Sequence, residues 1–336
     1  MMKFLLLTLL FLAQLFGETT LKIATYNIEN LFDLEKNGNE YKEYIPNDTS
    51  EWNQQTYKIK LKNIVQVIKD IDADIIALQE VESLQALLDL RFALKQSGLY
   101  YEHYAIADKK NTTVKVAILS KLPFVYAQEL SVTRTLEHRN ILETKFRIEG
   151  KELYIFVNHW KSKSGAESER IISAKALMKR AKEIGFDKNM IVLGDFNSDY
   201  EEFIKFKRKR NHNDTDGITG INHILGTINQ RVEAKEATFA KESFYNLWYD
   251  TEEEKRYSYI FKGKKEVLDN ILVSPTLLKG SSISYIHKSI TPFEKEYLFK
   301  KEKPYRWEIS QGKVKKHKGK GYSDHLAVIA KFKVTK

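Results

Sequence analysis

Short apolar runs alternate with helix-periodic stretches along most of the chain. Residues 21–26, 75–78 and 191–193 are rich in β-branched and other apolar side chains and are bounded by polar residues or glycine, which predicts buried strands. In residues 54–71 the apolar side chains recur at helical spacing, which predicts an amphipathic helix. The same reasoning predicts further strands at 101–107, 114–119, 140–148, 153–157, 267–273 and 327–334, and helices at 83–96 and 166–184.

The alternation of strands and helices over a chain of 336 residues predicts an α/β fold with one large domain, residues 18–336. Between residue 199 and about residue 241 the pattern weakens, which indicates surface loops and short helices.

Polar residues capable of chemistry follow several predicted strands at the point where each strand ends. Asp195 and Asn197 come after the run at 191–193, and because side chains alternate along a strand they can project to the same side. The ends of sheets are where α/β proteins place their sites. The residues collected in this way are Asn27, Glu29, Glu80, His159, Asp195, Asn197, Asp269, Asp324 and His325.

This set combines carboxylates and amides with two histidines, and the chain has no cysteine that could supply a thiolate or a disulfide. Such a set suits Mg²⁺, Mn²⁺ or Ca²⁺ rather than zinc or copper. Phosphodiester hydrolysis uses a divalent cation to neutralise charge, a carboxylate to orient or deprotonate water, and a cationic imidazole to stabilise the pentacovalent state. The set therefore predicts metal-assisted chemistry on a phosphate ester.

Each of these residues taken alone also has a simpler interpretation. Glu80 fits an acid in the first turn of the following helix, where the helix dipole favours it. A single Asp or Asn after a strand is usually a turn or cap residue, and His159 alone fits an ordinary surface or core histidine. Glu29 is longer than the shorter acids that could serve at its position, and its alternative is a side chain pointing to solvent. The joint occurrence of the residues, each after its own apolar strand, favours a site.

The motifs at these strand ends resemble those of the endonuclease/exonuclease/phosphatase superfamily, the deoxyribonuclease I-like fold. The resemblance covers residues 21–332 in order, and it implies a four-layer α/β sandwich of two mixed, mostly antiparallel sheets flanked by helices. The motifs that carry it are Tyr26-Asn27-Ile28-Glu29, Leu78-Gln79-Glu80, Asn158-His159-Trp160-Lys161-Ser162-Lys163, Gly194-Asp195-Phe196-Asn197, Leu268-Asp269-Asn270-Ile271-Leu272 and Ser323-Asp324-His325.

The resemblance also implies a role for each residue. Glu80 would be the principal metal ligand, with Asn27, Glu29 and Asp324 beside it. Asp195 would activate or align the attacking water, and Asn197 would hold the phosphate. His325 would contact the phosphate, kept protonated and oriented by Asp269, because a nearby carboxylate favours the charged imidazole. His159 would protonate the leaving oxygen.

Three basic residues are candidates for binding substrate phosphate. Arg139 resembles a family arginine that grips phosphate, although Arg134 is a nearby competitor and an ordinary exposed arginine is the alternative. Lys161 and Lys163 follow His159 closely, which suggests contacts to a phosphate backbone, whereas a solvated loop would have the same sequence.

The charge distribution bears on the substrate. The net charge is +10, which suits a polyanionic partner, and five lysines lie between Lys313 and Lys320, just before Asp324. Such a basic strip favours salt-sensitive attraction to nucleic acid, with a solvated loop as the alternative. Tyr305 and Trp307 nearby fit base stacking.

The first residues of the chain bear on its location. Residues 1–17 begin with a single lysine, continue as an apolar segment and end at a small residue, which predicts a secretory signal, with an uncleaved anchor as the alternative. We therefore expect a secreted or periplasmic, divalent-metal-dependent, non-specific DNA endonuclease that leaves 5′-phosphate ends and also acts on RNA. The alternatives are a lipid or inositol-phosphate phosphodiesterase or phosphatase of the same fold, and a non-catalytic nucleic-acid-binding module. No long heptad run is present, which favours a monomer.

Overall fold

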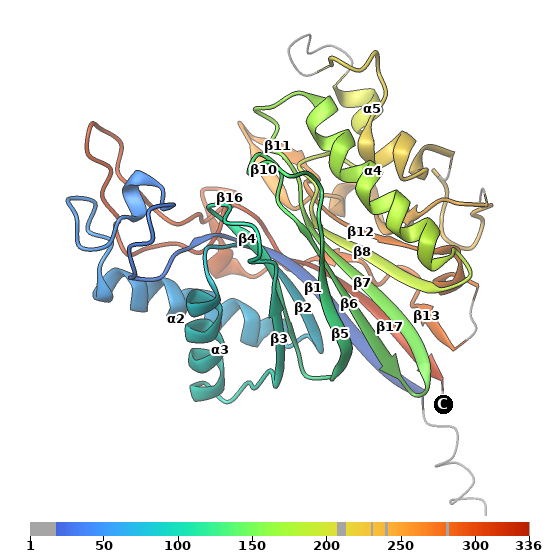
Figure 1. The fold of residues 1–336 in the computed structure, drawn as a ribbon, viewed down its shortest axis with the longest axis horizontal. Helices are drawn as coiled ribbons and strands as arrows, with labels where there is room; N and C mark the ends of the chain where they lie inside the picture. Colours follow the sequence, from blue (N-terminus) through green and yellow to red (C-terminus); the bar gives the residue numbers. More distant parts are fainter. Residues whose placement is uncertain (1–17, 207–212, 230, 239–240, 280–281, 336) are drawn as a thin grey trace, which may run out of the picture.

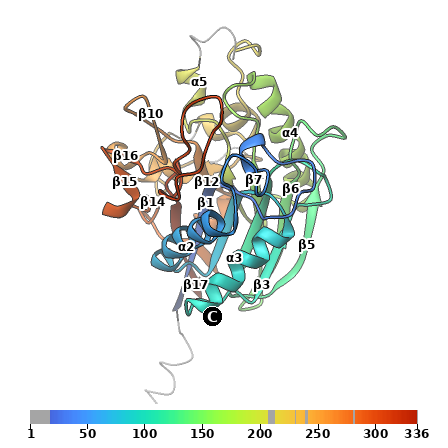
Figure 2. The same cartoon turned by 90° about the vertical axis from the view of Figure 1, so that its left-hand side faces the viewer.

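Two β-sheets lie face to face at the centre of the computed structural model, which describes residues 18–206, 213–229, 231–238, 241–279 and 282–335 (Figures 1 and 2). The predicted signal segment, residues 1–17, lies outside the described residues. Helices cover the outer face of each sheet (Figure 1). Within the described residues, no helix has the length and apolar character needed to cross a membrane.

The first sheet, as far as the structure describes it, has seven strands in the order β13–β17–β1–β2–β4–β3, with β14 beside β17. Strands β1 and β2 run parallel, and the other neighbouring pairs described run antiparallel. The strands are β1 (Glu18–Leu31), β2 (Ile75–Val81), β3 (His103–Ile106), β4 (Lys115–Ser120), β13 (Ile283–Tyr285), β14 (Thr291–Pro292) and β17 (Val328–Thr335).

The second sheet has six strands in the described part of the chain, in the order β5–β6–β7–β8–β12–β9. Here β7 and β8 are the parallel pair. The strands are β5 (Phe124–Leu130), β6 (Ile141–Ile148), β7 (Lys151–His159), β8 (Asn189–Asp195), β9 (Tyr245–Asn246) and β12 (Asp269–Val273). Two small ribbons lie outside the sheets, β10 (Tyr259–Phe261) with β11 (Lys264–Glu266) and β15 (Phe299–Lys300) with β16 (Lys303–Pro304).

The α-helices are α2 (Gln54–Ile71), α3 (Leu84–Gln96), α4 (Glu167–Ile184) and the short α5 (Glu202–Lys205). Asn53 begins α2 with a capping box, in which its side chain accepts the amides of Gln55 and Thr56 and the Thr56 hydroxyl accepts the Asn53 amide. Asp72 ends α2 in a left-handed conformation. Short helical turns are η2 (Lys42–Tyr44), η3 (Gly220–Ile224), η4 (Thr227–Asn229), η5 (Leu247–Asp250), η6 (Glu253–Lys255), η7 (Pro275–Leu277) and η8 (Glu296–Leu298).

Three apolar layers hold this arrangement together. Successive residues of a strand point to opposite faces, so Ile23 belongs to the layer between the sheets while Ala24 faces α2 and α3. Val192 of β8 likewise faces α4, whereas Leu193 faces the layer between the sheets. The predicted four-layer sandwich of two mixed, mostly antiparallel sheets is therefore confirmed.

Two predictions about elements need correction. Strand β5 was not predicted; it lies at the edge of the sheet, and its residues are half-buried or exposed. The segment after residue 199 is not only surface loop, since Ile221 and Leu225 are fully buried and pack in the same layer as Ala174 and Leu177 of α4.

Candidate active site

The ends of five strands bring the predicted polar residues together at one edge of the two sheets. Asp195 is the last residue of β8, and it pairs in register with His159 of β7 on one side and with Asp269 of β12 on the other. From the first sheet, Asn27 of β1 donates from Nδ2 to Asp195 Oδ2 at 3.0 Å. The register of the strands therefore places an acid of one sheet beside an amide of the other.

Gly194 permits β7 and β8 to approach each other just before Asp195. Its φ is +134°, and a Cβ at this position would lie 2.0 Å from the Asn158 carbonyl oxygen. No L-residue with a side chain fits there without moving the backbone of β7. The Gly-Asp order in the sequence thus has a steric cause.

Asn27, Glu80, Asp195 and His159 form the centre of the cluster. Asn27 Nδ2 also donates to Glu80 Oε1 at 3.0 Å, so one amide bridges the two carboxylates. His159 Nε2 lies 3.6 Å from Asp195 Oδ2 and 3.9 Å from Glu80 Oε1. Each of three residues offers one ligand atom, and these atoms lie within 4.8 Å of one another, close enough to share a metal ion. The residues are Glu80, His159 and Asp195.

Two residues of the cluster have left-handed backbone conformations. The φ angles are +67° at Glu80 and +47° at Asn197. Such conformations are uncommon for residues with a side chain and occur often at functional sites. Both residues lie at or just after a strand end, where the turn aims the side chain inward.

The two carboxylates lie in surroundings that favour a bound cation. Burial, followed by the nearby Asp324, raises the pKa of Glu80 above its usual range. Burial, with Asp269 and Glu80 close by and His325 opposing, raises the pKa of Asp195 to about 7. A divalent ion would supply the positive charge that these buried oxygens lack, so the donor set fits Mg²⁺ or a similar ion.

His325 forms a buried pair with Asp269. Its Nδ1 lies 2.7 Å from Asp269 Oδ2, and Asp269 is fully buried. Although burial acts in the opposite direction, Asp269, aided by Asp195 and Asp324, raises the pKa of His325 well above its usual value. His325 is therefore a cation at neutral pH.

The segment that carries His325 is tied to β1. The Ser323 hydroxyl donates to the Asn27 carbonyl oxygen at 2.7 Å, and the His325 amide donates to Ser323 Oγ at 3.1 Å. The Tyr259 ring packs on the imidazole with a centroid separation of 4.9 Å. These contacts fix the imidazole relative to Asn27.

His159 has the opposite protonation preference. Burial, with the cations Arg139 and His325 close by, lowers the pKa of His159 well below its usual value. Its Nδ1 is buried without a hydrogen-bond partner among the described residues. The predicted acid role requires a protonated imidazole, which these surroundings disfavour.

Asn197 and Arg139 meet at the carbonyl of Trp160. Asn197 Nδ2 donates to this oxygen at 3.2 Å and Arg139 Nη1 at 3.4 Å, while the Asn197 amide donates to Asp195 Oδ1 at 2.8 Å. The Tyr41 hydroxyl lies near both Arg139 and Glu80, and burial is the main reason why its pKa is raised. The structure thus brings Arg139 to the cluster. It also brings Tyr41, which the sequence did not indicate.

Glu29 is not brought to the cluster. Its carboxylate accepts hydrogen bonds from Arg306 Nε and from the Trp307 amide, each at 2.9 Å, and it is buried rather than pointing to solvent. The backbone at Glu29 and Asn30 is left-handed, and this irregularity turns the side chain away from Asn27. The predicted metal-ligand role of Glu29 is not supported by this placement. Asp324 lies closer, 3.4 Å from Arg306 and 3.9 Å from His325 Nε2.

The two lysines after His159 differ in their surroundings. Lys163 Nζ lies 3.0 Å from the buried carboxylate of Glu202 and 3.7 Å from that of Glu266, so its charge is already balanced. Lys161 is half-buried against Gly165. The placement of Lys163 does not support the predicted phosphate contact.

Trp307 needs correction as a base-stacking residue, and two lysines of the basic strip have acidic partners. Trp307 is 1% exposed and donates from Nε1 to His317 Nδ1 at 2.7 Å, inside an aromatic cluster with Trp52, so it has no free face for a base. Lys315 and Lys316 are paired with Glu43 and Glu51 at 2.9 and 2.7 Å.

Two buried cations support the site and were not predicted. Lys60 of α2 is fully buried and donates to the carbonyls of Glu29 and Tyr322, at 2.8 and 3.0 Å. Arg170 of α4 donates from Nη1 to three carbonyls of the segment after His159, at 3.1 to 3.4 Å. Lys60 lies on the apolar stripe of its helix, which is the signal that could have revealed it.

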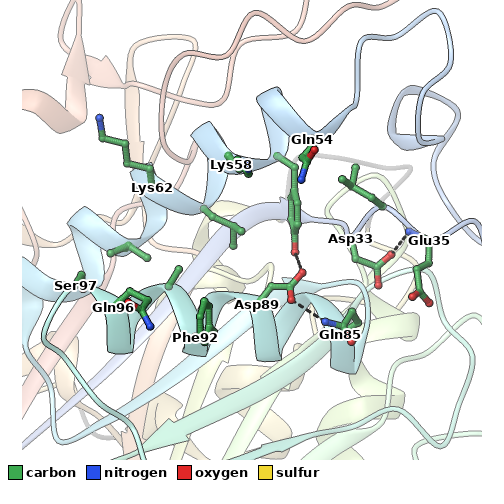
Figure 3. Close-up of a pocket in the computed structure, with 15 residues that line it drawn as sticks. Asp33, Glu35, Gln54, Lys58, Lys62, Gln85, Asp89, Phe92, Gln96 and Ser97 are labelled. Atoms are coloured by element: carbon green, nitrogen blue, oxygen red, sulfur yellow. Dashed lines mark hydrogen bonds between the residues drawn. The ribbon is translucent and has the colours of Figure 1, made fainter.

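A groove of about 790 Å³ lies away from this cluster, between α2 and α3 (Figure 3). The Tyr57 hydroxyl and Asp89 join the two helices across it at 2.8 Å. Leu61 and Phe92 give the groove apolar walls, and no residue of the catalytic cluster lines it. The groove is therefore separate from the cluster of strand-end residues.

The two-sheet sandwich, with buried carboxylates, amides and a His–Asp pair at one edge, defines a phosphoester-hydrolase site. The model of the "Endonuclease/Exonuclease/phosphatase family" matches residues 22–334, and the chain belongs to this family. Its members hydrolyse phosphoester bonds and depend on divalent metal. A comparison with curated proteins gives no significant match.

Solved structures show the same fold at low sequence identity. A humanized Danio rerio TDP2 has 14% identity and a TM-score of 0.57, with 93% of this chain and 98% of that chain covered. D. rerio TDP2 complexed with a single-strand DNA product has 13% identity and a TM-score of 0.57, with 94% and 99% covered. A mannosyl-6-phosphatase of Bacteroides thetaiotaomicron has 16% identity and a TM-score of 0.54, with 93% and 99% covered.

Proposed function

We propose that this protein is a divalent-metal-dependent phosphodiesterase that acts as a non-specific endonuclease on DNA, and also on RNA, leaving 5′-phosphate ends. The observation that carries the proposal is the cluster in which Asn27 bridges Glu80 and Asp195 while Asp269 holds a cationic His325 beside them. These groups supply a carboxylate pair for a metal and water, and a fixed cation for the phosphate.

Glu80, Asn27 and Asp324 would hold Mg²⁺, with Mn²⁺ or Ca²⁺ as alternatives. Bound there, the ion supplies positive charge next to the scissile phosphate. The remaining work falls to side chains of the chain. Asp195 accepts the proton of the attacking water, and the Asn27 amide at 3.0 Å keeps the carboxylate in place.

His325 donates a hydrogen bond from Nε2 to a non-bridging phosphate oxygen, because Nδ1 is engaged by Asp269. Asn197 and Arg139, which converge on one carbonyl, grip the other oxygens of the phosphate. His159 stays neutral and orients Asp195.

Three features support nucleic acid as the substrate. The net charge is +10. Arg139 lies at the cluster, and Arg306, which is paired with Glu29 and Asp324 and whose side chain is 61% exposed, lies at its rim. A structural relative, TDP2, was crystallised with a single-strand DNA product. Cations at the rim attract the phosphate backbone without reading its sequence.

We further propose that the protein is secreted or periplasmic and monomeric. The support for secretion is the basic start, apolar run and small residue in residues 1–17. Fractionation of cells that express the full chain, with N-terminal sequencing of the product, tests it. A product that retains residue 1 and stays in the cytoplasmic fraction contradicts it.

A phosphomonoesterase is the second candidate function. The mannosyl-6-phosphatase among the structural relatives shares this fold, and the cluster contains nothing that requires a diester. A lipid or inositol phosphate and a non-catalytic binding module are the further alternatives.

The experiment compares two substrates for one protein. Purified protein with Mg²⁺ or Mn²⁺ is expected to nick supercoiled plasmid, and Asp195→Ala and His325→Ala to abolish nicking. Asp187→Ala, at an exposed position, is the control that retains activity. Release of phosphate from sugar, inositol or lipid phosphates without nicking would favour the phosphatase. Binding of DNA without any hydrolysis would favour the binding module.

A further inference from the structure

A second cluster of metal-ligating side chains lies outside the catalytic cluster. His138 precedes β6, and Glu169 lies in the first turn of α4. One ligand atom each from Glu137, His138 and Glu169 lie within 4.8 Å of one another. The proposed function uses none of the three.

The geometry of His138 is unusual for an ion pair. Its side chain is 3% exposed, and Nε2 lies 3.0 Å from Glu169 Oε2. Nevertheless, Nε2 has no hydrogen-bond partner among the described residues, because the two atoms are close without being aligned. Two ligands about 2.0–2.1 Å from one zinc ion, at angles between a right angle and a tetrahedral one, are about 2.9–3.4 Å apart. The separation therefore fits two ligands aimed at a common ion.

The surroundings hold His138 in this orientation. The Thr133 hydroxyl lies 3.4 Å from Nδ1, which leaves Nε2 as the ligand atom. Lys110 Nζ donates to the carbonyls of His138 and Thr133, at 2.9 and 2.6 Å, and so ties down the loop that carries His138. Among the described residues, no Lys or Arg forms a salt bridge with Glu137 or Glu169.

A comparable cluster elsewhere in the chain differs in its carboxylates, which already have donors, although His287 Nδ1 also has no hydrogen-bond partner among the described residues. Asp250 accepts the amides of Ala234 and Lys288 through its two oxygens, at 2.8 and 2.7 Å. Glu233 is paired with the Lys288 ammonium at 2.9 Å. Near His287, therefore, the carboxylates already have donors, in contrast to those near His138.

We propose that Glu137, His138 and Glu169 form a second divalent-metal site, separate from the catalytic cluster, that takes a borderline ion such as Zn²⁺ or Mn²⁺. One imidazole with two carboxylates suits these ions better than Mg²⁺, which prefers oxygen ligands alone. Since His138 adjoins Arg139, the ion would also hold the loop that positions this arginine at the catalytic cluster.

Metal binding is tested by calorimetric titration of the chelator-treated full protein with Zn²⁺ in excess Mg²⁺. The parent protein is expected to bind one Zn²⁺. The variant His138→Gln is expected to lose this binding, whereas the double variant Glu80→Gln, Asp195→Asn is expected to retain it. Glu169→Gln, from a different element, must cause the same loss. His287→Gln is the matched control at the Asp250 cluster and must leave the binding unchanged.

Zn²⁺ binding that survives both His138→Gln and Glu169→Gln overturns the proposal, as does binding that is lost in His287→Gln. The readout is stoichiometry and not activity, so its outcome is independent of the substrate. Hydrogen exchange tests whether the bound ion also holds the loop that positions Arg139. Zn²⁺ is expected to slow exchange of amides in residues 133–140 in the parent but not in His138→Gln, and equal exchange with and without Zn²⁺ would contradict that link.

Discussion

The two histidines of the catalytic cluster lie close together but are held in opposite protonation states. Asp269 at 2.7 Å gives His325 a counter-charge, whereas His159 is buried near the cations Arg139 and His325. Because one imidazole is charged, the other is more stable when neutral. The carboxylate of Asp269 thus favours the proton on His325, while burial and the neighbouring cations disfavour it on His159.

Replacing Asp269 by Asn tests this assignment through the pH dependence of activity. Asp269 raises the pKa of His325 well above its usual value, with burial acting in the opposite direction. Without that charge we expect His325 to deprotonate at lower pH, so that the alkaline limb of the pH–rate profile moves toward acid and kcat/KM at neutral pH falls by about 10²–10⁴. The profile of plasmid nicking for the parent and Asp269→Asn gives the measurement.

Stability gives an independent check on the same residue. A histidine whose pKa is raised in the folded state stabilises that state. This contribution is complete below the pKa of the histidine in the unfolded chain, near 6.5, and is lost as the pH rises through its pKa in the folded protein. Asp269→Asn should therefore lower the free energy of unfolding more at pH 6 than at pH 10. A uniform loss at both pH values would show that Asp269 acts only through packing.

Removal of metal should have an effect that depends on pH. Burial and neighbouring carboxylates raise the pKa of Glu80 and raise that of Asp195 to about 7. For acids with raised pKa values, the metal-free protein loses stability as pH rises from the unfolded values toward 7. A bound cation offsets the repulsion between the ionised carboxylates. The melting temperature in Mg²⁺ is therefore expected to exceed that in EDTA by more at pH 8 than at pH 5.

Scanning fluorimetry over this pH range measures the effect. The double variant Glu80→Gln, Asp195→Asn should lose most of the Mg²⁺ response at both pH values. If the parent shows the same shift at pH 5 and pH 8, the ion does not bind to these carboxylates.

At the scale of the element, local patterns in the sequence predicted helices and buried strands but not how their ends turn. Helix α2 was predicted over its observed length because its apolar side chains recur at helical spacing, and the structure adds the caps at Asn53 and Asp72. The end of β1 was not predicted. The backbone at Glu29 has a left-handed φ, and the side chain binds Arg306, which lies 277 positions away in the sequence. The period of a strand carries no information about such an irregularity.

The site was predicted to a similar extent. Strand register places Asp195 beside His159 and Asp269. Asn27 then joins Asp195 to Glu80, and Asp269 holds His325. Lys163 and Trp307 were misplaced, because their partners, Glu202 and His317, lie in segments whose packing is not periodic. Long-range pairing of this kind cannot be read from local spacing.

Gly194→Ala tests how closely β7 and β8 must approach. A Cβ at residue 194 would lie 2.0 Å from the Asn158 carbonyl, and φ is +134°. We expect a loss of more than about 2 kcal/mol in the free energy of unfolding, together with loss of activity through the displaced Asp195. Urea denaturation gives the first quantity.

Gly150→Ala is the control for this substitution. It also has a positive φ, +76°, but nothing lies within 4 Å of its added Cβ. It should therefore cost only the backbone strain, about 1 kcal/mol, and leave activity intact. Equal losses for the two variants would mean that strain, and not the contact between β7 and β8, makes glycine necessary.

Over the whole molecule, the positive charge is less available than its sum suggests. The loop that carries the basic strip lies beside residues 42–52, where Glu43 and Glu51 take up Lys315 and Lys316 (Figure 2). His317, the next residue after Lys316, is buried against Tyr44 and Trp52. The strip is thus anchored to the protein through its middle, while both ends remain exposed.

This arrangement predicts that the five lysines contribute unequally to DNA binding. Lys313, Lys318 and Lys320 are exposed, and no salt bridge with an acidic side chain is described for them. Each lysine that contacts a phosphate contributes about 0.9 to the slope of log K against log salt. Replacing these three by Gln should lower the slope by up to about 3, whereas Lys315→Gln with Lys316→Gln should change it less, because Glu43 and Glu51 already neutralise those charges. Fluorescence anisotropy of a labelled duplex between low and physiological salt measures both variants. A larger change in the paired variant would show that DNA displaces the glutamates, and no change in either would assign the substrate-binding charge to Arg139 and Arg306 instead.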